Sequence, residues 1–426
     1  MTAPLPETVT VCADLKDLER PAPMGSLHHR AGRSGDIFAF EYDQTWLQRP
    51  EAFTFDPDLA LVKGPQYPAP DRTNFGIFLD SSPDRWGRVL MQRRENMRAR
   101  RERRRPRSLT EWDFLLGVHD ETRMGALRFQ DPKTGRFLDT DDAFAAPPLA
   151  SLRELQAASL QFELHADEDE RHEYEQWLKL LFAPGTSLGG ARPKASVRDQ
   201  HGLLCLAKFP SRQDRRDVGA WELVAYRLAA KAGIDVPPTR ALRVPDSAYT
   251  TVLARRFDRT PKGRRLAFVS AMTLTQRSDG EPGASYLELV DLLQSRGANT
   301  REDCAQLYRR VVFSILIHNT DDHLRNHGFF IGDRGISLSP AYDLNPSNDR
   351  DQLSLAINEV DTVCDVSVAR EAHADYGLSK TEADAIIAKT AAAVRRWKSE
   401  AARLGIPKSE QELMAPAFES ASGHHT

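Results

Sequence analysis

The sequence has no long apolar run and no excess of charge of one sign. No uninterrupted apolar stretch of the 426 residues approaches the roughly 20 that a membrane-spanning helix needs. Its first ten residues lack the basic cluster and the apolar core of a secretory signal. The 58 Lys and Arg nearly balance the 61 Asp and Glu, so the surface as a whole is not built to grip phosphate backbones. We therefore expect a cytoplasmic protein without a membrane partner, and its size favours an enzyme.

Cysteine is scarce, and its spacing excludes the usual cysteine-based sites. The four cysteines lie far apart and form no C-x-x-C pair (Cys12, Cys205, Cys304 and Cys364). Zinc sites and redox pairs use close spacing, and a disulfide framework needs many more cysteines per residue. We expect buried or incidental thiols in a reducing compartment.

The pattern of apolar residues divides the chain into three parts. Residues 1–148 combine strand-like runs with turns and are expected to form an N-terminal subdomain. Residues 149–258 begin with an amphipathic helix over 149–164, in which leucines 149, 152, 155 and 160 recur, and continue as strands around one helix. Residues 259–426 are mostly helical. This order predicts an α+β protein of two lobes, sheet-rich and then helical, with a cleft between them.

Two local patterns stand out in the N-terminal part. Residues 36–43 alternate apolar with acidic or small residues, as a half-buried strand does, and Pro83 is placed near the first turn of a helix. Between Gln92 and Arg107 there are nine arginines and two glutamates, a local net charge of +7. This block is either a solvated helix that continues into a charged loop or a contact for nucleic acid or an acidic partner. It contains no aromatic residue, which disfavours a surface that stacks single-stranded bases.

The sharpest cluster of polar residues follows an apolar helical stretch that ends at Ile317. Asp321 and Asn326 have the D-x-x-x-x-N spacing of the catalytic loop of protein kinases, in which the Asp orients or deprotonates the hydroxyl and the Asn holds magnesium. A strand is expected at 328–331, and Asp343 beyond it offers a second hard oxygen ligand. Taken alone, such Asp and Asn residues are more often capping or turn residues.

Three histidines lie in the same stretch, at His318, His323 and His327. Their spacing lacks the H-x-x-x-H pattern that places two ligands on one helical face, so a transition-metal site is disfavoured. We expect His323 to brace the loop by hydrogen bonds.

A second cluster surrounds two consecutive glycines, Gly189 and Gly190. They allow the backbone to approach a phosphate closely, while Ser187 and Lys194 add a donor and a positive charge. The stretch does not match the Walker pattern G-x-x-x-x-G-K-[ST]. An ordinary hairpin turn is the alternative.

The strand expected at 203–209 carries Lys208 on the same face as its leucines, so the ammonium group needs either a partner or a path to water. The helix expected at 218–231, ended by Gly233, supplies Glu222 as that partner. A strand lysine paired with a helix glutamate is the device that fixes a kinase lysine on the nucleotide phosphates.

In this order the motifs resemble the HipA family of bacterial serine/threonine kinases, the toxin half of type II toxin–antitoxin pairs. The residues that carry the resemblance are Gly189–Lys194, Ala207–Pro210, Arg256–Asp258, Asn319–Asn326 and Pro340–Leu344. The stretch 75–88 also looks like the small N-terminal subdomain of that family. The resemblance therefore implies a protein-kinase-like fold with an added N-terminal subdomain.

The resemblance also implies ATP and Mg²⁺ as cofactors. Asp321 would be the catalytic base, and Asn326 and Asp343 would hold the magnesium. Ser187 matches the serine whose autophosphorylation ejects the glycine loop and inactivates the kinase. The residues expected at the nucleotide site are Ser187, Gly189, Gly190, Lys208, Glu222, Arg256, Phe257, His323 and Asn326.

The partners implied by the resemblance are a helix-turn-helix antitoxin of the HipB type, operator DNA bound jointly with it, and a protein substrate such as an aminoacyl-tRNA synthetase. Arg255 departs from the family, which often has an acidic residue near this position. Two other functions stay open. One is a kinase of small molecules or lipids, and the other is a degenerate kinase fold that acts as a co-repressor on DNA.

Overall fold

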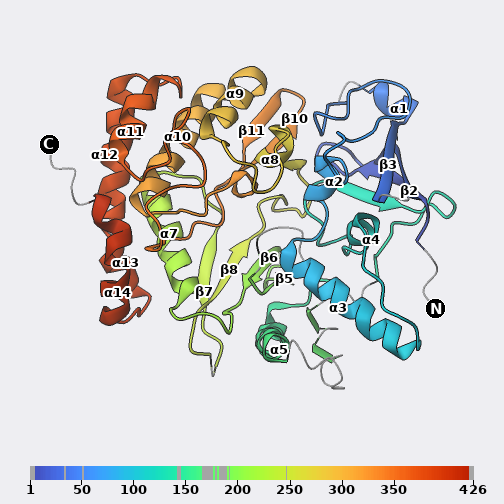
Figure 1. Ribbon diagram of the computed structural model, residues 1–426, viewed down its shortest axis with the longest axis horizontal. Helices are drawn as coiled ribbons and strands as arrows, with labels where there is room; N and C mark the ends of the chain where they lie inside the picture. Colours follow the sequence, from blue (N-terminus) through green and yellow to red (C-terminus); the bar gives the residue numbers. More distant parts are fainter. Residues whose placement is uncertain are drawn as a thin grey trace. The chain divides into compact units, whose positions relative to one another are not determined.

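The computed structural model describes residues 5–32, 35–49, 52–141, 145–165, 176–177, 180–181, 190, 192–245 and 247–421. The chain forms two compact units. Unit 1 comprises residues 1–213, 255–269 and 331–333, and unit 2 comprises residues 214–254, 270–330 and 334–426. Both units contain helices and strands, which confirms the predicted α+β class (Figure 1). No helix within the described ranges is long and apolar enough to cross a membrane.

Unit 1 opens with an antiparallel sheet. Its strands are β1 (Thr8–Ala13), β2 (Ala22–Gly32), β3 (Gly35–Tyr42) and β4 (Leu127–Gln130), in the order β3-β2-β1-β4. The strand predicted at 36–43 is β3, and its alternate residues Phe38, Phe40 and Tyr42 are buried while Ile37 is exposed. Short helices α1 (Gln44–Leu47), α2 (Gly76–Asp80) and α4 (Glu111–Leu116) complete this part.

Helix α3 (Arg85–Arg101) carries the arginine-rich block. Its N-cap is Asp84, whose carboxylate accepts a hydrogen bond from the Gly87 N–H at 2.7 Å. Pro83 directly precedes the cap, so it lies near the first turn as predicted, and Asp84 satisfies one of the free N–H groups there. The helix ends at Arg101 and continues into an exposed loop, as the first of the two alternatives predicted.

The amphipathic helix predicted at 149–164 is a 3₁₀ turn, η2 (Leu149–Ser151), followed by α5 (Leu152–Leu164). Leu152, Leu155 and Phe162 are buried, whereas Leu160 is exposed, so the buried face of the helix continues through Phe162 and not through Leu160. The Phe162 ring meets Trp86 of α3 edge to face with centroids 5.4 Å apart. Strands β5 (Lys194–Arg198) and β6 (Leu204–Lys208) then form an antiparallel pair.

Strands β7 (Thr239–Leu242), β8 (Thr251–Arg255), β9 (Phe268–Ser270), β10 (Gly328–Gly332) and β11 (Gly335–Leu338) lie wholly or partly in unit 2. Its helices are α7 (Val218–Ala232), α8 (Ala271–Leu274), α9 (Tyr286–Arg296), α10 (Thr300–Leu316), η3 (Leu324–Asn326), α11 (Val366–Glu371), η4 (Ala372–Ala374), α12 (Lys380–Val394), α13 (Trp397–Arg403), α14 (Lys408–Met414) and η5 (Ala415–Ala421).

Helix α7 lies at the centre of the unit 2 core. It packs against α12 and α13, which are drawn orange to red in Figure 1. The Trp221 ring packs near Trp397 and Phe418, and its indole N–H donates to Glu410 at 2.7 Å. Gly233 caps the helix in the left-handed conformation with φ of 88°, as predicted.

All four cysteines are free and buried, as expected. Burial raises the pKa of the Cys12 and Cys304 thiols to about 11. Buried thiols of this kind are unreactive near neutral pH.

Candidate functional site

The D-x-x-x-x-N loop follows a buried helix end. Helix α10 stops at Leu316, and His318 then adopts a left-handed backbone with φ of 48°, which turns the chain sharply. The loop ends in η3 and leads directly into β10. Asp321 and Asn326 thus lie between two buried elements, where the sequence placed them.

The buried carboxylate of Asp322 holds this loop in place. It accepts hydrogen bonds from the Tyr286 hydroxyl at 2.7 Å and the Ser314 hydroxyl at 3.0 Å, and its other oxygen lies 2.9 Å from Nε2 of His327. Burial alone would raise the pKa of Asp322, but His327 and the two hydroxyls outweigh it and hold the pKa below its usual value. The sequence analysis did not identify Asp322 as a site residue, although the presence of two consecutive aspartates could have indicated a second functional carboxylate.

The bracing role predicted for His323 belongs to His327 instead. His327 is buried and bonds Asp322, whereas Nδ1 of His323 is buried without a hydrogen-bond partner among the described residues. A histidine can brace a loop only where a carboxylate or carbonyl faces it, and Asp322 faces the later histidine.

Asp321 and Asn326 are joined through the backbone. The Asn326 side-chain amide donates to the carbonyl oxygen of Asp321 at 3.0 Å, and Asn326 is buried. The Asp321 side chain is exposed. The bond occupies the NH₂ of Asn326 and leaves its amide oxygen to face other groups.

The P-A-Y-D-L segment, Pro340–Leu344, is hydrogen-bonded to the D-x-x-x-x-N loop. The Tyr342 hydroxyl donates to the Arg325 carbonyl at 2.7 Å, and the Asn345 N–H donates to Oδ1 of Asn319 at 3.2 Å. Both ends of the D-x-x-x-x-N loop are thereby fixed against the segment that contains Asp343.

Asp343 itself has a left-handed backbone, with φ of 58°. Its N–H donates to the Tyr226 hydroxyl at 3.1 Å, and its Oδ1 accepts from the Asn345 side chain at 3.1 Å. A non-glycine residue in this conformation costs free energy and is held only where its surroundings fix it. Such strain is common at functional sites.

The oxygen donors suit magnesium better than a transition metal. Across the described ranges, no group of three or more His, Cys, Asp or Glu side chains is arranged to hold a metal ion. Asn326 and Asp343 offer an amide oxygen and a carboxylate, and magnesium is often bound by one or two carboxylates together with substrate phosphates. The residues present therefore fit Mg²⁺ accompanied by a phosphate ligand.

The glycine segment belongs to unit 1. Ser187 and Gly189 lie outside the described residues, and Gly190 is described. Lys194, which the sequence placed among the phosphate donors, is instead buried. Its ammonium lies 2.8 Å from Asp84 and donates to the Gly190 carbonyl at 2.9 Å. The Lys194 ammonium is thus neutralised by Asp84, and this internal ion pair connects the glycine segment to the N-cap of α3.

Lys208 pairs with Lys194 across the β5–β6 ladder and is half-buried at the end of β6. Glu222 is buried on α7. Lys208 belongs to unit 1 and Glu222 to unit 2. The ion pair predicted between them stays a prediction.

The buried Arg256 side chain bonds to other residues of unit 1. Its guanidinium bonds Asp258 at 2.8 and 2.6 Å and donates to the Thr122 carbonyl at 2.6 Å. The contact with nucleotide that was predicted for Arg256 stays a prediction. The Phe257 ring lies 5.7 Å from Phe268.

Tyr286→Phe tests whether the hydrogen bonds of the buried Asp322 carboxylate stabilise the loop, an arrangement called here the Asp322 brace. The free energy of unfolding should fall by about 1.5–3 kcal/mol, because the variant removes a hydrogen bond to a buried charged group. Tyr376→Phe is the matched control, since the equally buried Tyr376 hydroxyl donates to the neutral Ile357 carbonyl and its loss should cost about 1 kcal/mol. Urea unfolding of both variants measures the difference, and equal losses would contradict a charged Asp322.

A protein-family model matches part of the chain. Residues 186–397 match the family model described as the HipA-like C-terminal domain. This stretch contains β5, β6, α7 and the D-x-x-x-x-N and P-A-Y-D-L segments.

Two curated relatives match part of the chain. "Putative kinase Y4dM" of Sinorhizobium fredii is 30% identical over 150 residues, which are 33% of this chain and 36% of that protein. Toxin YjjJ of Escherichia coli is 27% identical over 171 residues, 38% of each. The matched stretches thus span little more than a third of these relatives.

A solved structure matches nearly the whole chain. It is a chain of the Shewanella oneidensis MR-1 complex of the toxin–antitoxin system HipA and HipB with its operator DNA. The TM-score is 0.65 at 17% sequence identity, and the match covers 97% of this chain and 95% of the other. At this identity the likeness establishes a shared fold.

Proposed function

Because residues 186–397 match the family model of the HipA-like C-terminal domain, we propose that the protein is a serine/threonine kinase that uses ATP and Mg²⁺. The observation that carries the proposal is the arrangement in unit 2. Asp321 is exposed in the loop after a buried helix, and the Asn326 side chain donates to its carbonyl oxygen. The bonds from Tyr342 and Asn345 tie the segment that contains Asp343 to the same loop. This is the set of groups that phosphoryl transfer requires.

Each residue has a role in this proposal. Asp321 accepts the proton of the attacking hydroxyl as the bond to the γ-phosphorus of ATP forms, while the bond from that phosphorus to the bridging oxygen breaks and ADP leaves. The oxygens of Asn326 and Asp343 hold the metal, which when bound neutralises charge on the phosphates. Lys208 and the backbone of Gly189 and Gly190 contact the phosphates. The Asp322 brace keeps the base in position by fixing the neighbouring backbone.

The proposed cellular role is that of the toxin in a type II toxin–antitoxin pair. The shared fold with the Shewanella oneidensis protein and the partial match to toxin YjjJ support it. The proposed partners are a HipB-like antitoxin with a helix-turn-helix, operator DNA bound jointly with it, and a protein substrate such as an aminoacyl-tRNA synthetase.

Autophosphorylation tests both the chemistry and its regulation. Incubation with Mg²⁺ and ATP should add one phosphoryl group to the purified protein, and the modified peptide should carry it on Ser187. A phosphate adds nearly two negative charges to a segment meant to hold anions, so activity toward other substrates should then fall. Ser187→Ala should remain unmodified, while the neighbouring control Thr186→Ala should be modified like the wild type.

Intact mass spectrometry and peptide mapping provide the measurement. An unchanged mass together with no ATP binding would exclude the kinase. Transfer only to lipids or small molecules would identify the alternative class of kinase. Tight operator binding with the antitoxin that is insensitive to Asp343→Ala, without any transfer, would indicate a co-repressor.

A further inference from the structure

Unit 1 contains a small cavity whose wall is dominated by arginine. It has a volume of about 170 Å³ and lies where the β5–β6 turn, the end of β8 and the loop 259–265 come together. The charged residues that line it are Arg198, Arg255, Arg256, Arg259, Arg265 and Glu121. Five guanidinium groups and one carboxylate thus face the same space.

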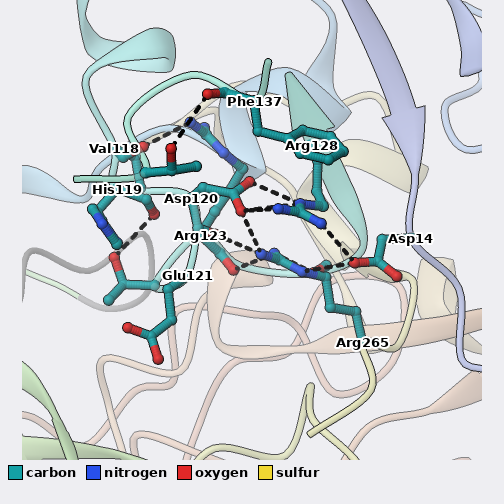
Figure 2. A network of polar contacts seen from close by, with 12 residues as sticks. Asp14, Val118, His119, Asp120, Glu121, Arg123, Arg128, Phe137 and Arg265 are labelled. Atoms are coloured by element: carbon teal, nitrogen blue, oxygen red, sulfur yellow. Dashed lines mark hydrogen bonds and ion pairs between the residues drawn. The ribbon is translucent and has the colours of Figure 1, made fainter. Parts of the chain in front are cut away.

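Most of these arginines have internal partners. Arg256 and Arg259 share the buried carboxylate of Asp258. Arg265 and Arg128 converge on Asp120 and approach Asp14, as the dashed lines of Figure 2 show. Arg198 pairs with Glu121. With Arg128 and the Asp199 carboxylate near Arg255 included, six arginines stand against five carboxylates, so positive charge is in slight excess around the cavity.

The arginines that carry the excess positive charge are partly shielded from water. Burial and the neighbouring guanidinium groups lower the pKa of Arg259 to about 9, and burial lowers the pKa of Arg265 as well. An anion in the cavity would oppose both effects, since an opposite charge within about 4–6 Å favours the charged form.

Arg255 is the lining arginine whose guanidinium has no hydrogen bond to the described residues, although Asp199 attracts it electrostatically. No described residue accepts a hydrogen bond from its guanidinium, and the side chain is partly exposed where it lines the cavity. Oδ1 of Asp199 accepts the N–H groups of His201 and Leu203 in the β5–β6 turn, so Asp199 attracts Arg255 by charge and not through a described hydrogen bond. A guanidinium offers two parallel N–H groups to an oxyanion, an arrangement that suits phosphate.

The size of the cavity limits the ligand. A volume of about 170 Å³ equals that of five or six waters at about 30 Å³ each. Pockets for drug-sized molecules run from about 300 to 1,000 Å³, so a whole nucleotide does not fit. A small oxyanion with a few waters does.

We propose that this cavity is a binding site for a small oxyanion of the phosphate type, with Arg255 as its principal donor. Arg198 is the second donor, and Glu121 competes with the ligand for it. Figure 2 shows the Glu121 carboxylate pointing away from Asp120 and Arg265. Arg256, which was also expected at the nucleotide site, lines the cavity, whereas Asp321, Asn326 and Asp343 are not among its lining residues.

Isothermal titration of the full chain with inorganic phosphate, at constant ionic strength, tests the proposal. The wild type should bind one phosphate. Arg255→Gln should weaken binding about tenfold or more, since it removes a charge-assisted hydrogen bond. Glu121→Gln should tighten binding, because it removes the competing carboxylate. Two single substitutions thus shift the affinity in opposite directions.

Two further variants separate this site from other sources of phosphate affinity. Arg105→Gln removes an equally charged, exposed arginine after α3 and should leave the affinity unchanged. Lys208→Met disables the proposed contact with ATP and should also leave it unchanged. An absence of binding to the wild type would overturn the proposal. So would an equal loss in Arg105→Gln, which indicates general charge screening, or a loss in Lys208→Met, which places the phosphate at the nucleotide site.

Discussion

Asp321→Ala should reduce phosphoryl transfer by about a thousandfold and leave the stability of the protein nearly unchanged. General base catalysis contributes roughly 10²–10⁴ to rate. The Asp321 carboxylate is exposed, and the hydrogen bond described for this residue uses its backbone carbonyl, which alanine retains. Substitutions at such positions usually change stability by less than about 0.5 kcal/mol. Loss of activity would therefore report on chemistry and not on folding.

The measurement is phosphate incorporation at saturating ATP, with urea unfolding alongside. Asp333→Ala is the matched control, since Asp333 is an exposed aspartate in the turn between β10 and β11. It should retain full activity. If Asp321→Ala kept wild-type activity, the base would have to be another group, and the assignment of the D-x-x-x-x-N loop would fail.

Asp258→Asn should lower the free energy of unfolding by about 3–5 kcal/mol. The carboxylate is fully buried between Arg256 and Arg259, and it also accepts the Gly125 N–H at 2.9 Å. Asparagine keeps the shape but leaves two buried guanidinium groups without their counter-charge. Breaking a buried pair in this way is strongly destabilising, in contrast to replacing the whole pair by apolar groups.

The effect of Asp258→Asn should depend on pH. Burial alone would raise the pKa of Asp258, but Arg256 and Arg259 hold it well below its ordinary value of 3.8. Because the folded-state pKa is depressed, the stabilisation is complete above the unfolded pKa and is lost as the pH falls below about 4. The difference between wild type and variant should therefore shrink in acid.

Urea unfolding at neutral and acid pH tests both statements. Asp384→Asn is the control, because Asp384 forms a partly exposed ion pair with Arg370 that should contribute only about 0–1 kcal/mol. A loss at Asp258 no larger than at Asp384 would mean that water reaches the buried arginines.

The location of the candidate site was predictable from local pattern, whereas its internal contacts were not. Helix α7 with its cap at Gly233, the loop around Asp321 and the strand β10 follow from apolar periodicity and turn chemistry. Which of two adjacent aspartates turns inward depends on what Tyr286 and Ser314 offer from other helices. No spacing rule within the loop contains that information.

Long-range charge pairing was missed for the same reason. Lys194 was assigned to phosphate because it follows a Gly-Gly turn, but its partner Asp84 lies far away in the sequence, at the cap of α3. Arg256 and Asp258 were identified as a motif, yet their neighbours Thr122 and Gly125 come from another part of unit 1. Burial decides how such charges are used, and burial is a property of the assembled fold.

The left-handed backbone at Asp343 determines which substitutions are informative there. Among residues with a Cβ, Asn and Asp tolerate this conformation best, whereas β-branched residues do not. Alanine at this position would alter backbone strain and remove an oxygen ligand together, so a loss of activity would have two causes. Asparagine keeps the turn and one oxygen while removing the charge. It is therefore the replacement that separates the electrostatic contribution of Asp343 from its architectural one.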